Sequence, residues 1–121
     1  MAVASPDGRP YPWGDVKPDE LRANFGKRVD SPTPVGIYPA GAGKYGHHDL
    51  SGNVQEWSLD VDRDVKSTDK QLRDWRHPRI LCGGSYWDDA RAMAAAVYDW
   101  LRSGSRHDSN GFRVAAEPAL R

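Results

Sequence analysis

Apolar and polar positions form a clear pattern at two places in this chain, and both places predict strands. Residues 80–81 are a short apolar run that predicts a buried strand. The glycine pair 83–84 follows, where a backbone without Cβ atoms can bend or approach another backbone closely. Phe112 and Val114 fall on one face of the chain and Arg113 on the other, which is the alternation of a half-buried strand. We therefore expect two strands that frame the residues between them.

The segment between these strands has the composition of a contact surface. It is rich in Tyr, Trp, Asp, Ser, Arg, His and Asn, which suit contact with a ligand better than the filling of a core. Within it, residues 92–97 favour a short buried helix or strand, with Met93 and Val97 in the core. Residues 102–110 also match an ordinary exposed loop, because loops use the same residue types, so both interpretations stay open.

The other elements are expected to be short. Residues 18–24 predict one or two helical turns, with Pro and acidic residues at the start. Residues 34–39 predict an extended piece fixed by prolines, and residues 40–46 predict a glycine-rich turn. Trp13 is expected to pack against the core beneath a Pro-Gly turn. Residues 60–77 mix charges of both signs and predict a solvated excursion.

Composition narrows the classes of fold and function. The 121 residues suffice for one domain with a modest core, and 12 Gly, 9 Pro and 5 Trp indicate many loops and short strands. Basic and acidic residues balance at 17 each, which argues against a nucleic-acid partner. No apolar run approaches the ~20 residues of a membrane span, and residues 1–6 lack the features of a signal peptide. A soluble chain of undetermined compartment is expected. Cys82 is the single cysteine, which leaves no internal disulfide and favours a small buried strand residue.

Asp49 and Glu56 are the first candidates for a metal site. They lie on either side of a Gly-Asn turn, where inward carbonyl groups could join them as the hard oxygen ligands that Ca²⁺ prefers. Taken alone, two acids at this spacing are more often ordinary surface charge. The neighbours His47 and His48 are disfavoured as ligands, because adjacent side chains on an extended backbone point to opposite faces.

Six short motifs follow one another over nearly the whole chain. They are Tyr-Pro-Trp-Gly-Asp at 11–15, Arg-Ala-Asn at 22–24, Pro-Val-Gly at 34–36, Asp-Leu-Ser-Gly-Asn-Val-Gln-Glu-Trp at 49–57, Leu-Cys-Gly-Gly-Ser-Tyr at 81–86 and Gly-Phe-Arg-Val-Ala at 111–115. In this order they resemble the formylglycine-generating enzyme (sulfatase-modifying factor) family. The resemblance implies an irregular α+β fold, a C-type-lectin-like variant with short antiparallel strands and many loops.

The resemblance also implies how the domain is organised. The segment that precedes the first motif in family members has no counterpart here, so residues 1–121 resemble a single domain or the C-terminal half of one. Without its complement the core would be incomplete, and the missing N-terminal half or a second copy is the expected partner.

By the same resemblance, calcium would bind at the 49–57 motif. The implied ligands are the side chains of Asp49 and Glu56 and the carbonyl groups of Gly52 and Val54. A second family site would involve Asn24 and Phe25, with Asp30 as a loose candidate. We expect a structural role for calcium.

The chemistry of the oxidase members is not expected here. Those members bind Cu(I) through two cysteines after the Gly-Gly-Ser motif, because soft thiolates select that ion, and Asp88 and Met93 stand at these positions. No copper is therefore expected. A related branch makes sulfoxides with histidine-bound iron, a triad that would lie largely in the missing half and that His47 and His48 do not reproduce.

A third branch of the family, the variable proteins of diversity-generating retroelements, displays ligand-binding residues between fixed strands. Residues 87–91, Trp-Asp-Asp-Ala-Arg, fit the pattern of its variable region, and we take 80–115 as the corresponding region here. The predicted ligand-binding residues are Tyr86, Trp87, Asp88, Asp89, Tyr98, Asp99, Trp100, Arg102, Ser103, His107, Asp108 and Asn110.

The resulting hypothesis is a display protein without catalytic residues that binds a protein or glycan. Aromatic and Arg side chains would supply contact area, and Ser, Asp and Asn adaptable hydrogen bonds. The alternative is a fragment of a formylglycine-generating-enzyme-like oxidase or of a non-haem-iron sulfoxide synthase.

Overall fold

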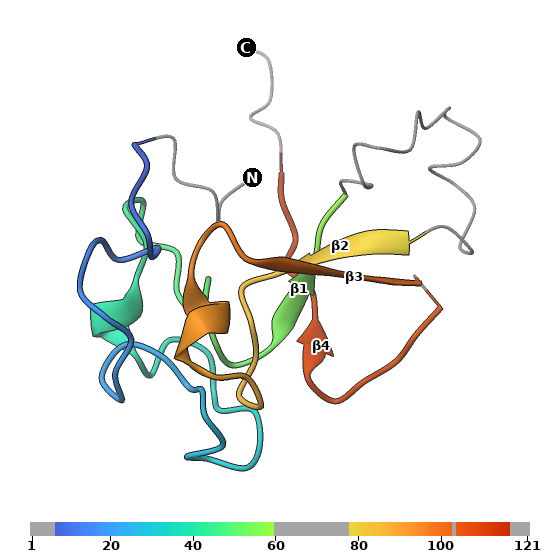
Figure 1. Cartoon of the computed structure of the whole chain (residues 1–121), viewed down its shortest axis with the longest axis horizontal. Coiled ribbons are helices and arrows are strands. Elements are labelled where there is room, and N and C mark those ends of the chain that lie inside the picture. The colour runs from blue at the N-terminus through green and yellow to red at the C-terminus, as the bar shows by residue number, and fades with distance from the viewer. Residues whose placement is uncertain (1–6, 60–77, 103, 117–121) are drawn as a thin grey trace.

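The computed structural model describes residues 7–59, 78–102 and 104–116, which form a small sheet on one side and long loops on the other (Figure 1). The elements of this part are η1 (Pro39–Gly41), β1 (Gln55–Trp57), β2 (Pro78–Cys82), η2 (Ala90–Met93), β3 (Tyr98–Arg102) and β4 (Asn110–Gly111), where η is a 3-10 helix. A mixed small sheet with few helices and many loops confirms the predicted fold class. Neither helix in these ranges is long and apolar enough to cross a membrane.

The sheet has the strand order β3-β2-β1-β4. The predicted antiparallel pairing holds for β2, which is antiparallel to both β3 and β1, whereas β4 pairs with β1 in parallel orientation. The register sets Tyr98, Cys82, Glu56 and Gly111 opposite one another in one row across the four strands. Because directly opposed residues share a face of a sheet, the side chains of Tyr98, Cys82 and Glu56 lie on the same side.

The core confirms most of the predicted apolar positions. Leu81, Tyr86 and Met93 expose at most 2% of their surface, and Cys82 is buried in β2 as expected. Trp13 packs against the cluster around Met93, as its aromatic turn predicted. Val97 was expected in the core but is 44% exposed, because it lies in the turn after η2, where its N–H donates to the Ala94 carbonyl group.

The glycine pair after β2 allows the close backbone approach that the sequence predicted. Gly83 has a φ of +95°, and a Cβ atom built there would lie 2.6 Å from the carbonyl oxygen of Leu50. Its own carbonyl oxygen accepts a 2.7 Å hydrogen bond from the N–H of Gly52. This contact joins the end of β2 directly to the 49–57 motif.

The two predicted elements before the sheet have different outcomes. Residues 18–24 form one turn, the lower limit of the prediction, in which the Asp19 carbonyl group accepts hydrogen bonds from the N–H groups of Arg22 and Ala23. Residues 34–39 turn rather than extend, since Gly36 has a φ of +83° and its N–H donates to Asp49 Oδ2. A tertiary hydrogen bond overrides the local pattern at 34–39.

The predicted closing strand also differs. β4 ends at Gly111, and Phe112 and Val114 are 77% and 84% exposed, so the half-buried strand is wrong in this structure. The alternation fails to predict burial because no described segment covers that face. The predicted solvated excursion at 60–77 lies outside the described residues.

Candidate ligand-binding surface

The first part of the predicted contact segment holds its own loop together. Asp88 Oδ2 accepts hydrogen bonds from Ser85 N–H at 2.8 Å and Ser85 Oγ at 2.7 Å. Asp89 caps η2 by accepting from Arg91 N–H and also pairs with the Arg91 guanidinium group. These hydrogen bonds lower the pKa of Asp89. Both carboxylates are therefore engaged within the loop.

Tyr86 and Trp87 are tied to the loop at residues 24–27. Lys27 N–H donates to the Tyr86 carbonyl group, and Gly26 N–H donates to that of Asp88, both at 2.8 Å. The ammonium group of Lys27 lies 4.1 Å from the centre of the Trp87 ring, a cation–π contact. Tyr86 is buried, which raises the pKa of its hydroxyl group. Tyr86 therefore belongs to the scaffold, whereas Trp87 stays 43% exposed beside Lys27.

The open part of the segment is β3. Tyr98 and Trp100 are 62% and 61% exposed, and as alternate residues of one strand they share a face. Asp99 lies on the other face and accepts a hydrogen bond from Trp100 N–H, and Arg102 closes the strand in an exposed position. The backbone of β3 is fixed by its pairing with β2. Two large aromatic side chains are thus presented by a well-positioned strand.

Residues 104–110 follow β3 and carry three further predicted ligand residues. His107 and Asp108 are exposed, and the Asp108 carboxylate faces Tyr86, whose pKa it raises further. Asn110 is half-buried, and its side-chain nitrogen has no hydrogen-bond partner within the described residues. Ser103 lies outside the described residues.

The two acidic residues predicted as calcium ligands at 49–57 are already engaged with other groups. Glu56 accepts two hydrogen bonds of 2.5 Å from Arg113, and Asp49 Oδ2 accepts one of 2.7 Å from Gly36 N–H. The same contacts raise the pKa of Arg113, mainly through Glu56. This arrangement does not fit calcium. Calcium binding at this motif stays a prediction, and it would require Arg113 to release the Glu56 carboxylate.

The second implied calcium position differs, because it has an unused acceptor. Asn24 is 2% exposed and donates to the Ser31 carbonyl group, while its Oδ1 atom has no partner among the described residues. Phe25 is buried and Asp30 is exposed. The part of the chain that the structure describes holds no group of three His, Cys, Asp or Glu side chains placed for a metal ion. Calcium at Asn24 stays a prediction.

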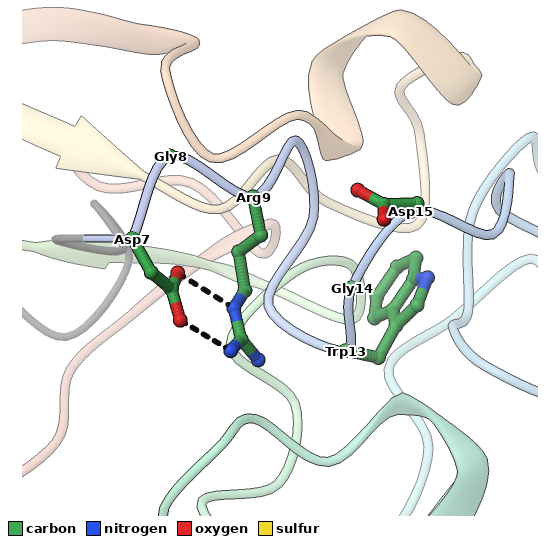
Figure 2. A pocket seen from close by; sticks show the side chains of 6 residues that line it. All are labelled: Asp7, Gly8, Arg9, Trp13, Gly14 and Asp15. Carbon is green, nitrogen blue, oxygen red and sulfur yellow. Dashed lines mark hydrogen bonds and ion pairs between the residues drawn. The ribbon is translucent and has the colours of Figure 1, made fainter.

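Residues 7–9 and 13–15 line an open hollow of about 450 Å³ (Figure 2). The Asp7 carboxylate pairs with Arg9 on one side, and Trp13 and Asp15 lie on the other. Lys44 also contacts Asp7, at 3.2 Å. Because these charges largely pair with one another and none of the predicted ligand residues lines the hollow, it is separate from the surface described above.

A small mixed sheet embedded in loops, with exposed aromatic and polar residues after a buried Gly-Gly turn, defines a C-type-lectin-like domain of the formylglycine-generating type. The chain belongs to the sulfatase-modifying factor enzyme 1-like family, whose model matches residues 1–118.

Comparison with individual proteins gives two kinds of neighbour. In sequence, the chain is 35% identical to the hercynine oxygenase of Mycobacterium tuberculosis and 42% identical to that of Mycolicibacterium thermoresistibile, in each case over 88% of the chain. It spans only 27% and 26% of those proteins. In structure, it is similar to Treponema denticola variable protein 1, with a TM-score of 0.61 and 25% identity over 76% of this chain and 34% of that one.

Two features of the surface were missed from the sequence. β3 was not predicted, although Tyr98 and Trp100 on either side of Asp99 are a short strand signal. The contact of Lys27 with Trp87 had no signal, because it joins segments far apart in the chain.

Proposed function

We propose that β3 and the loop that follows it form the substrate-recognition surface of an oxygenase related to the hercynine oxygenases. The observation that carries this proposal is the exposure of Tyr98 and Trp100 on one face of a hydrogen-bonded strand. Side chains of this size are seldom left exposed together on a fixed strand without a binding role.

The chemistry of this surface suits a betaine. Hercynine is histidine with a trimethylated amino group, so it carries a permanent positive charge beside a carboxylate. Aromatic rings attract quaternary ammonium groups, and Tyr98 and Trp100 offer two such rings. Asp108 adds negative charge, and Arg102 is an exposed partner for a carboxylate.

The identities of 35% and 42% to two hercynine oxygenases support this ligand class over others. They favour the enzyme-related alternative of the sequence analysis over a display protein. For this chain the proposal concerns recognition, and the exposure of Tyr98 and Trp100 supports it.

The test is hercynine binding to the full-length protein by isothermal titration calorimetry. Replacing Tyr98 or Trp100 by Ala should weaken binding by about 2- to 30-fold each, the range of one cation–π contact. Tyr45→Ala is the matched control, because Tyr45 is 73% exposed elsewhere on the chain. Histidine, which lacks the trimethylammonium group, should bind more weakly than hercynine. Equal affinity in the Tyr98, Trp100 and Tyr45 variants would contradict the proposal.

A display protein is the second candidate, favoured by the structural similarity to Treponema denticola variable protein 1. In that case the same surface would bind a protein or glycan, and hercynine would not bind. Sequencing codons 86–110 in the source population separates the two candidates. Substitutions confined to adenine positions there, with an imperfect copy nearby in the DNA, would support display. A uniform sequence without such a copy would argue against it.

A further inference from the structure

We infer that Arg113 replaces a calcium ion at the 48–56 loop, which overlaps the 49–57 motif. Its guanidinium group binds the oxygen atoms that would otherwise be ligands of that ion. The inference does not depend on the proposed function. It concerns an ion pair on the sheet face that also carries Tyr98, since Glu56 and Tyr98 share a row.

The guanidinium group of Arg113 gathers four oxygen atoms from three residues. Its Nε and Nη2 atoms donate to the two carboxylate oxygens of Glu56, both at 2.5 Å. Nη2 also donates to the carbonyl oxygens of His48 at 3.0 Å and Asp49 at 3.2 Å. Carboxylate and carbonyl oxygens are the ligand types that calcium prefers, so a planar cation here satisfies groups that would suit a spherical one.

In this arrangement the carboxylates of Asp49 and Glu56 already bind other groups of the chain instead of a metal ion. Both Glu56 oxygens face Arg113, and the Glu56 side chain is only 17% exposed. Asp49 has a left-handed backbone, with a φ of +53°, and its carboxylate holds the N–H of Gly36. A calcium ion at Glu56 would therefore have to displace the guanidinium group or lie beside a like charge.

The origin of this cation matters for folding. Arg113 follows β4 and lies 57 residues after Glu56 in the chain, so the pair forms only when β4 docks beside β1. Folding of the C-terminal segment thus brings the positive charge of Arg113 next to the Glu56 carboxylate. The loop then requires no free metal ion for its stability.

The experiment compares calcium responses in the full-length protein. Melting temperature and calcium stoichiometry, the latter by titration calorimetry, are measured with EGTA and with excess CaCl₂ for the wild type, Arg113→Gln and Arg106→Gln. Arg106 is the matched control because it is an exposed arginine in the loop before β4. Arg113→Gln should lower the melting temperature in EGTA by about 4 °C or more. It should also bind one more calcium ion than the wild type and regain part of the lost temperature with calcium. Arg106→Gln should match the wild type.

The added calcium must depend on Glu56. The double variant Arg113→Gln with Glu56→Gln should therefore lose the extra calcium ion. This requirement separates the site from any calcium bound at Asn24, which would be the same in all variants.

Three outcomes would overturn the inference. These are an unchanged melting temperature for Arg113→Gln in EGTA, no extra calcium in that variant, and calcium binding by the wild type that Glu56→Gln abolishes. Should Arg113→Gln fail to fold, Arg113→Lys keeps the charge but loses the two-pronged contact. It should then melt below the wild type without any gain in calcium binding, and a wild-type melting temperature would count against the inference.

Discussion

Asp88 and Asp99 are alike in the sequence but have different surroundings. Asp88 holds the N–H and hydroxyl groups of Ser85, so its carboxylate shapes the turn after the Gly-Gly pair. Asp99 is exposed and accepts a hydrogen bond only from the adjacent Trp100 N–H among the described residues. One aspartate builds the scaffold, and the other lies on the surface.

These surroundings predict different effects on stability. Asp88→Ala should lower the free energy of unfolding by about 1–2 kcal/mol, because it leaves the N–H of buried Ser85 without its acceptor. Asp99→Ala should change it by less than about 0.5 kcal/mol, as for most exposed substitutions. Urea denaturation of both variants measures the difference. A stable Asp88→Ala variant with lost ligand binding would instead make Asp88 a contact residue.

Single residues also explain where sequence reasoning succeeded. Burial of Leu81 and Met93 and the close approach at Gly83 follow from local rules on apolar runs and glycine. Arg113 shows where such rules end. Its opposite orientation to Phe112 was expected from alternation, but its partner Glu56 comes from a distant part of the chain.

Among the elements, η2 depends on a titrating cap. Asp89 is the N-cap of η2, and the hydrogen bonds from Arg91 lower its pKa below the ordinary value of 3.8. A folded-state pKa below the unfolded one means that the stabilisation is present above the unfolded pKa. It is lost as the pH falls through the folded pKa.

The stability advantage of the wild type over Asp89→Asn should therefore be present at about pH 6 and shrink on acidification to about pH 2. The other carboxylates titrate in both proteins, so their effect on stability cancels when the wild type and the variant are compared. Urea denaturation across this range measures the difference between the two. A difference that is constant with pH would show that the charge of Asp89 does not contribute.

The strands were predicted to unequal degrees for a physical reason. β2 carries its signal in its own residues, because Ile80, Leu81 and Cys82 are apolar and buried. β3 is mostly exposed and exists through pairing with β2, so its apolar content alone does not reveal it. The same argument applies to residues 34–39, where a contact with Asp49 decides the turn. Long-range pairing is what the pattern lacks.

At the scale of the whole molecule, the apolar side chains that follow the last strand of the sheet are exposed to solvent. Phe112 and Val114 are both more than three-quarters exposed and follow β4 in close succession. The chain spans about a quarter of the hercynine oxygenases that it matches. That a further segment or a second copy covers this side stays a prediction from the sequence.

The 121-residue chain by itself should therefore self-associate as its concentration rises, because adjacent exposed apolar groups attract one another. Replacing Phe112 and Val114 together by Ser should reduce this association. Val35→Ser should change it less, since Val35 is also exposed but lies in a separate loop. Light scattering after size exclusion measures the mass. A monomer at every concentration would contradict the prediction.

β3 has one more consequence, which concerns protein engineering. Its position comes from main-chain pairing with β2, and any side chain except proline leaves those bonds intact. The outward positions Tyr98, Asp99, Trp100 and Arg102 can therefore be exchanged at small cost to folding. A library of variants could therefore be made by substituting these positions of β3, while the Gly-Gly turn and η2 are kept unchanged.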